Sequence, residues 1–144
     1  MEQSKEIVEY PIKDEWRILF NLFLEELPWL KEDKDFQEDG YVFCLPNSAF
    51  AHVVFDILRA DDVLMKKREI NGIENFVNKY FTTENIKDLP RDYLDFEIKD
   101  SIIDHLMVDD KWKKVFHFKG EALKRVNEYV SKDERFNKVL FSER

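Results

Sequence analysis

The chain has 144 residues, of which 44% are hydrophobic and 38% are charged, and its formal net charge is −8. These values predict a soluble globular protein, a single domain over residues 1–144, and they exclude a disordered chain. One cysteine, Cys44, excludes an internal disulfide, and the polar first ten residues lack the apolar core of a signal peptide, so we expect a cytoplasmic protein that does not contact a membrane.

The negative charge is concentrated in the first part of the chain. Residues 1–62 contain 15 acidic and 6 basic residues, a net charge of −9, whereas residues 63–144 contain 16 acidic and 17 basic residues, a net charge of +1. An acidic surface repels nucleic acid and anionic membranes and attracts basic proteins. We therefore expect a basic protein partner.

The first predicted helix covers residues 15–27, with Asp14 as its N-cap and Pro28 as its stop. Its apolar residues follow the helical period, and Ile18 and Leu22 widen the apolar face beyond a stripe. This pattern predicts a central, largely buried helix.

The next predicted elements follow an acidic stretch. Residues 6–10 and 41–45 are short strand candidates because residues with high β-propensity dominate them. A second helix is expected from residue 47 or 48 to about residue 59, and a bent continuation beyond it stays open. A third helix is expected to begin at Asn71, with Glu74 as its capping-box partner.

The last third of the chain predicts three more helices. They cover residues 92–107, 120–130 and 133–141, and the last one has Phe136, Val139 and Leu140 facing inward. Residues 115–118 alternate and are a further strand candidate. The predicted fold is mainly α, with five or six helices; a small sheet of two or three strands, which would make the class α+β, stays open.

The segment DFQEDGYVFCLP resembles a calcium-binding EF-hand loop in its first half only. Asp35, Asp39 and Gly40 match positions 1, 5 and 6 of that loop. Position 9 is Phe43, which has no side-chain oxygen, and position 12 is Pro46, where the loop requires a bidentate glutamate. We therefore interpret the segment as an acidic turn.

Enzyme chemistry has one candidate in the sequence. Asp100, Asp104, His105 and Asp109 lie close together along the chain, and carboxylates with imidazole can hold a metal ion. A metal-assisted hydrolase is accordingly the alternative function. Nucleophile and phosphate-binding motifs are missing from the sequence, so the prediction leans away from an enzyme and includes no cofactor.

Two further patterns are weighed against simpler explanations. His52, Asp56 and Arg59 share a helix face, which is usual for a solvated row of ion pairs. The segment KWKKVFHFK interleaves bases with rings, as single-stranded nucleic-acid sites do, but the net charge and expected burial of its rings argue against nucleic acid.

The leading hypothesis is a non-enzymatic protein-binding module, such as an inhibitor, an immunity or antitoxin-like protein, or an accessory subunit. Rings set within an acidic stretch are typical of an interface hot spot, unless those rings pack back onto the core. A structural homo-oligomeric subunit is a further alternative. The predicted partner-binding residues are Trp29, Glu32, Asp33, Asp35, Phe36, Glu38, Asp39, Tyr41, Asp61 and Asp62.

Overall fold

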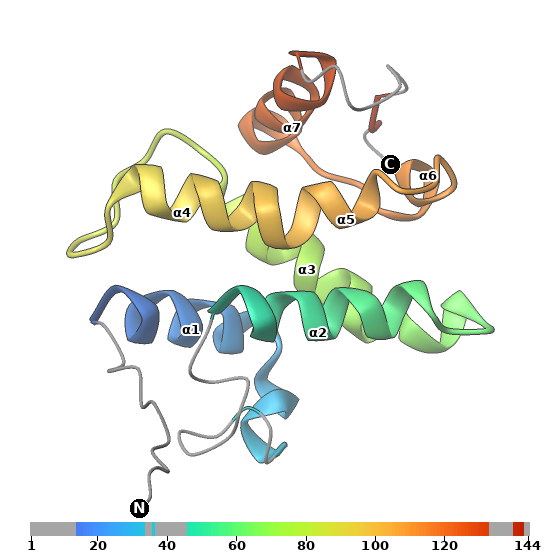
Figure 1. Ribbon diagram of the computed structural model, residues 1–144, viewed down its shortest axis with the longest axis horizontal. Coiled ribbons are helices and arrows are strands. Elements are labelled where there is room, and N and C mark those ends of the chain that lie inside the picture. Colours follow the sequence, from blue (N-terminus) through green and yellow to red (C-terminus); the bar gives the residue numbers. More distant parts are fainter. Residues whose placement is uncertain (1–13, 34–35, 37–45, 133–139, 143–144) are drawn as a thin grey trace, which may run out of the picture.

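The fold is mainly α, as predicted. The computed structural model describes residues 14–33, 36, 46–132 and 140–142, and helices joined by turns make up this part of the chain (Figure 1). Its only bridge of β type is an isolated one between Ile86 and Leu89. The strand candidates at residues 6–10 and 41–45 lie outside the described residues.

The helices form two layers. Figure 1 shows α1 (Asp14–Glu26) and α2 (Pro46–Leu58) on one side of the molecule. A long rod lies opposite them, made of α4 (Arg91–Ile98), a π-helical turn η5 (Lys99–Ile103) and α5 (Asp104–Leu106). The α2 helix packs directly on η5, which joins the layers. Residues 92–107 were predicted as one helix, and the rod runs unbroken across almost the same range.

Helix α3 (Lys67–Tyr80) is the centre of the fold. It contacts both α1 and α2, and α7 (Gly120–Lys132) packs on it as well. The α1 contact is close: a Cβ atom on Gly72 would lie 2.6 Å from Leu27 Cγ and 2.9 Å from the carbonyl oxygen of Glu26. Only glycine fits at this position without a shift of its neighbours.

Phenylalanine rings from three helices meet in the core. The ring centres of Phe23 on α1 and Phe50 on α2 lie 4.2 Å apart, and Phe76 on α3 lies 5.3 Å and 5.4 Å from them. All three side chains are fully buried. Offset and edge-to-face pairs of this kind contribute about 0.5–1.5 kcal/mol each beyond the area they bury. These three phenylalanines therefore help to fix α1, α2 and α3 against one another.

The predicted start of the third helix was wrong. A 3-10 turn, η4 (Val63–Lys66), leads directly into α3 at Lys67, so Asn71 lies inside the helix. Asp62 caps η4, because its Oδ1 accepts a hydrogen bond from the Leu64 N–H at 3.0 Å, whereas α3 has Lys66 at its N-cap and no side-chain cap. Glu74 is buried inside α3 and does not cap the helix.

The strand predicted at residues 115–118 was also wrong. Helix α6 (Trp112–Val115) includes its first residue, and the chain then becomes extended from Phe116. The His117 N–H donates to Glu74 Oε2 at 2.7 Å, and the Lys119 N–H donates to Asn78 Oδ1 at 2.8 Å. Two side chains one turn apart on α3 thus replace the partner strand. The alternation itself was informative, since the side chains on either side of His117 are fully buried.

Two predictions at the ends of helices also differ from the structure. Asp14 is the first helical residue of α1 instead of its N-cap. Leu140 is 47% exposed, although it was predicted to face inward, and the neighbouring Phe141 is buried instead. The side chain of Asn127 bonds both the N–H and the carbonyl oxygen of Phe141, which fixes this orientation. The rest of the predicted helix at 133–141 lies outside the described residues.

Candidate functional site

Three of the residues predicted to bind a partner, Trp29, Asp33 and Phe36, line a groove of about 240 Å³, here called the Trp29 groove. It lies where η1 (Pro28–Glu32) meets α2 and the start of α3. Its lining combines rings, carboxylates and one arginine: Trp29, Leu30, Asp33, Phe36, His52, Val53, Asp56, Arg68 and Glu69.

Local sequence explains how η1 presents Trp29. Pro28 ends α1, and successive turns follow, in which the N–H groups of Leu30 and Asp33 donate to carbonyl oxygens three residues earlier. Leu30 is buried. It therefore anchors η1 to the core and leaves the half-buried Trp29 at the edge of the groove.

Two ring contacts shape the walls of the groove. The guanidinium carbon of Arg68 lies 4.1 Å from the centre of the Trp29 ring, within range of a cation–π interaction. The exposed His52 ring packs edge-on against Phe36, with ring centres 5.6 Å apart. Phe36 is only 2% exposed, so this ring packs onto the core and is not presented to a partner.

The lining of the groove is net negative. Three carboxylates (Asp33, Asp56 and Glu69) stand against the guanidinium of Arg68 in the described lining. Arg68 Nη2 lies 3.4 Å from Glu69 Oε2. Lys66 Nζ, from the neighbouring turn η4, donates to Asp56 Oδ2 at 2.7 Å, and this hydrogen bond is the main reason that the pKa of Lys66 is raised. The Asp56 carboxylate remains half exposed and open to solvent.

Trp29 also borders a second hollow, of about 520 Å³, on the α3 side. Glu26, Lys67 and Asn75 are among the residues that line this hollow. The indole therefore stands between two depressions of the surface.

The remaining predicted residues lie in different places. Glu32 is exposed at the end of η1, next to Asp33. Asp61 and Asp62 are exposed in the turn before η4, outside the lining of the groove. Beside them, Leu64 and Met65 are 81% and 78% exposed, which makes this turn an apolar and acidic tip. Asp35, Glu38, Asp39 and Tyr41 lie outside the described residues.

Sequence reasoning missed His52, Asp56 and Glu69 as part of this site. The spacing of His52 and Asp56 put them on one helix face, which is correct, but they were interpreted together with Arg59 as a solvated row. In the structure the ion-pair partner of Asp56 is Lys66, and Arg59 lies 5.9 Å from the centre of the Phe55 ring instead. Only the packing of η1 against α2 and α3 brings these groups beside Trp29.

The candidate hydrolase residues point to separate partners. Asp104 Oδ1 accepts a hydrogen bond from the Tyr129 hydroxyl at 2.5 Å, the His105 ring lies 4.5 Å from the Phe55 ring, and Asp109 Oδ1 accepts the Lys111 N–H. Within the described part of the chain, no group of three or more His, Cys, Asp or Glu side chains is arranged to hold a metal ion.

The rings of the KWKKVFHFK segment belong to the core. Trp112, Phe116 and Phe118 are buried, and Lys113 is 2% exposed with its Nζ bonded to Asp110 Oδ1 at 2.7 Å. Base stacking requires exposed ring faces. These three rings are therefore not placed to stack on single strands.

Comparison with protein-family models, with curated proteins and with solved structures finds no match to this chain. Among the residues that the structure describes, no helix has the length and apolar character needed to cross a bilayer. Functional inference therefore depends on the chemistry of the Trp29 groove itself, whose lining combines the half-buried Trp29 with three carboxylates.

Proposed function

We propose that this chain is a non-enzymatic protein-binding module that contacts a basic partner through the Trp29 groove. An inhibitor, an immunity or antitoxin-like protein, or an accessory subunit is the kind of protein meant. The observation that carries the proposal is a half-buried tryptophan at the edge of a groove lined by three carboxylates.

Tryptophan is among the residues that contribute most to binding energy at protein interfaces, because a large rigid ring buries much area at a low entropy cost. Trp29 is held in place before binding by the Arg68 guanidinium on its ring and by the anchored turn η1. A side chain that is already ordered loses less conformational entropy when a partner covers it. Both features support an anchor role for Trp29.

The acidic groups would guide a basic partner to this anchor. Charge complementarity mainly increases association rates and selects among partners, and its effect weakens as salt screens the field. The acidic and apolar tip, with Asp61, Asp62, Leu64 and Met65, adjoins the groove through the Lys66–Asp56 ion pair. We include this tip in the proposed surface.

The test is capture of partners by the tagged protein from the cells that produce it, after chemical cross-linking, quantified by mass spectrometry. The first variant is Trp29→Ala, and the second neutralises the groove with Asp33→Asn, Asp56→Asn and Glu69→Gln. A matched control neutralises three exposed acids elsewhere, Glu25, Glu84 and Glu128. Loss of a hot-spot tryptophan costs at least about 2 kcal/mol, or roughly thirtyfold in affinity.

The proposal expects a basic protein that the wild type and the control capture equally and that both groove variants lose. Circular dichroism must show that every variant is folded. Equal recovery with the groove variants, or a recovered partner with an acidic surface, would count against the proposal. Loss with the control variant as well would show a general effect of charge and no specific groove.

A further inference from the structure

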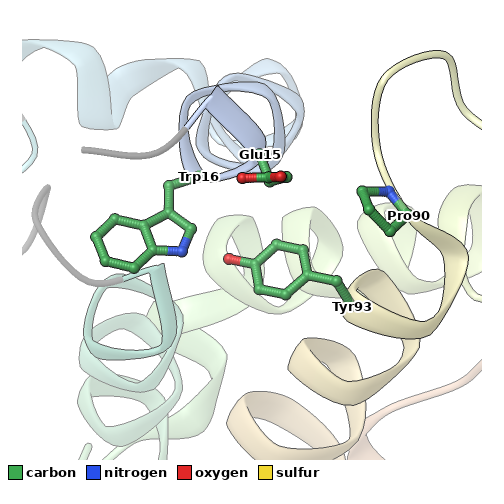
Figure 2. A pocket seen from close by; sticks show the side chains of 4 residues that line it. All are labelled: Glu15, Trp16, Pro90 and Tyr93. Carbon is green, nitrogen blue, oxygen red and sulfur yellow. The ribbon is translucent and has the colours of Figure 1, made fainter. Parts of the chain in front are cut away.

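A further hollow, separate from both depressions beside Trp29, opens between the starts of α1 and α4, and it is here called the α1–α4 hollow. Figure 2 shows its four lining residues: Glu15 and Trp16 from the first turn of α1, and Pro90 and Tyr93 from the start of α4. Its volume is about 210 Å³. Pockets for whole small molecules usually measure about 300–1,000 Å³, so this hollow is sized for a single side chain.

A buried hydroxyl and a partly exposed carboxylate face the hollow. The Tyr93 hydroxyl is buried and has no hydrogen-bond partner among the described residues. In Figure 2 this hydroxyl points toward the nitrogen-bearing edge of the Trp16 indole, and the Glu15 carboxylate lies to one side of both. The Glu15 carboxylate, which is only partly buried, lines the same hollow. A buried hydroxyl without a partner is rare, so the Tyr93 hydroxyl calls for a polar group in the hollow, and the Glu15 carboxylate, an acceptor only, favours one that donates hydrogen bonds.

The electrostatics of the hollow favour a cation. Burial raises the pKa of Tyr93, and the charges of Glu97 and Glu15 raise it further, so the phenol stays protonated and neutral. The neutral phenol can donate and accept a hydrogen bond, and Glu15 supplies the negative charge that favours a cation. Arg91, adjacent to Pro90, does not neutralise this charge, because its guanidinium bonds Asp95 and the carbonyl oxygens of Tyr80 and Glu84.

We propose that the α1–α4 hollow binds the cationic side chain of a lysine or arginine on a protein partner. The cation would pair with Glu15 and donate a hydrogen bond to Tyr93 Oη, and its hydrocarbon stem would lie against the Trp16 ring. An acidic side chain would be repelled by Glu15, and an apolar one would leave the Tyr93 hydroxyl without a partner. The inference rests on the proposed function only in requiring that the partner be basic.

The binding test uses short peptides instead of the partner. Acetyl-Gly-Lys-Gly-amide and its arginine counterpart are titrated into the ¹⁵N-labelled full chain, with acetyl-Gly-norleucine-Gly-amide as the neutral control. The chain has three tryptophans, so three indole N–H signals report separately on Trp16 in this hollow, Trp29 in the groove and Trp112 in the core. Binding is expected to shift the Trp16 signal with the cationic peptides and not with norleucine.

Three variants assign the effect to the hollow. Glu15→Gln and Tyr93→Phe should each weaken peptide binding by about threefold to tenfold, since each removes one polar contact with the cation. Glu25→Gln, an exposed acid on the same helix, is the matched control and should leave binding unchanged. Tyr93→Phe should not destabilise the fold, because the hydroxyl it removes has no described partner. Equal binding of norleucine, or unchanged binding by both hollow variants, would overturn the proposal.

This experiment separates the hollow from the Trp29 groove. Trp29→Ala should leave the Trp16 shift unchanged. A shift at Trp16 without any captured partner would support the hollow and count against the proposed function. A captured basic partner with no peptide-induced shift at Trp16 would leave the proposed function standing and overturn this inference.

Discussion

Glu74→Ala tests the contact that holds the extended segment after α6 onto α3. The Glu74 carboxylate is buried and accepts the His117 N–H at 2.7 Å. A hydrogen bond to a charged group contributes about 1.5–3 kcal/mol, and the one methylene that alanine lacks adds about 0.8 kcal/mol when fully buried. Alanine regains only a few tenths of a kcal/mol through its higher helix propensity. We expect the free energy of unfolding to fall by about 2–4 kcal/mol.

Asn78→Ala is the internal comparison for this prediction. Asn78 Oδ1 accepts a hydrogen bond from the Lys119 N–H, two residues after His117, at 2.8 Å. This bond is exposed, and both of its groups are neutral. Its loss should cost only about 0.5–1.5 kcal/mol. Urea unfolding followed by circular dichroism gives both values, and hydrogen exchange of the His117 amide should accelerate in Glu74→Ala alone. If Glu74→Ala costs no more than Asn78→Ala and the His117 amide stays protected, the reasoning is refuted.

Three further predictions concern stability, each measured by urea unfolding. Gly72→Ala should destabilise by about 1–3 kcal/mol despite the better helix propensity of alanine, because its Cβ would lie 2.6 Å from Leu27 Cγ; a more stable variant would contradict this. Glu97→Gln should stabilise the protein at neutral pH. Burial raises the pKa of Glu97 in the folded state above its ordinary value of 4.5. The wild type therefore loses stability as the pH rises from 4.5 through the folded-state pKa, because the unfolded chain releases the Glu97 proton first. Below pH 4.5 Glu97 is protonated in both states, so the advantage of glutamine should disappear there. An advantage that persists in acid would contradict the assignment. Asp95→Asn should lower the free energy of unfolding by about 2 kcal/mol, because the Asp95 carboxylate bonds the partly buried Arg91 and Arg125. An unchanged free energy of unfolding would mean that solvent already screens these two ion pairs.

The helices themselves were predictable because their cause is local. Apolar residues at the helical period predicted the core faces of α1 and α2, and the phenylalanines among them form the ring cluster of the core. The long rod of α4, η5 and α5 was predicted to within one residue at each end. The π-helical turn within it carried no sequence signal that we recognised.

The candidate site was predictable only in part. The acidic stretch and its rings predicted that Trp29 and Asp33 belong to one binding surface, and in the structure both line one groove. Phe36 has the same local signature as Trp29 but is buried, because successive turns direct it at Phe20 and His52. Burial of an aromatic ring is decided by what packs around it, and the sequence around each ring does not contain that information.

The sequence by itself determined the helical class, the apolar faces and the acidic first half of the chain, since these depend on composition and on spacing within a few residues. Tertiary structure decided which polar groups meet. Glu74 holds His117 from 43 residues away, and Glu15 and Tyr93 face one hollow from different helices. Such contacts connect elements distant along the chain, and they are fixed by how α1, α3 and α4 pack, which no local pattern encodes.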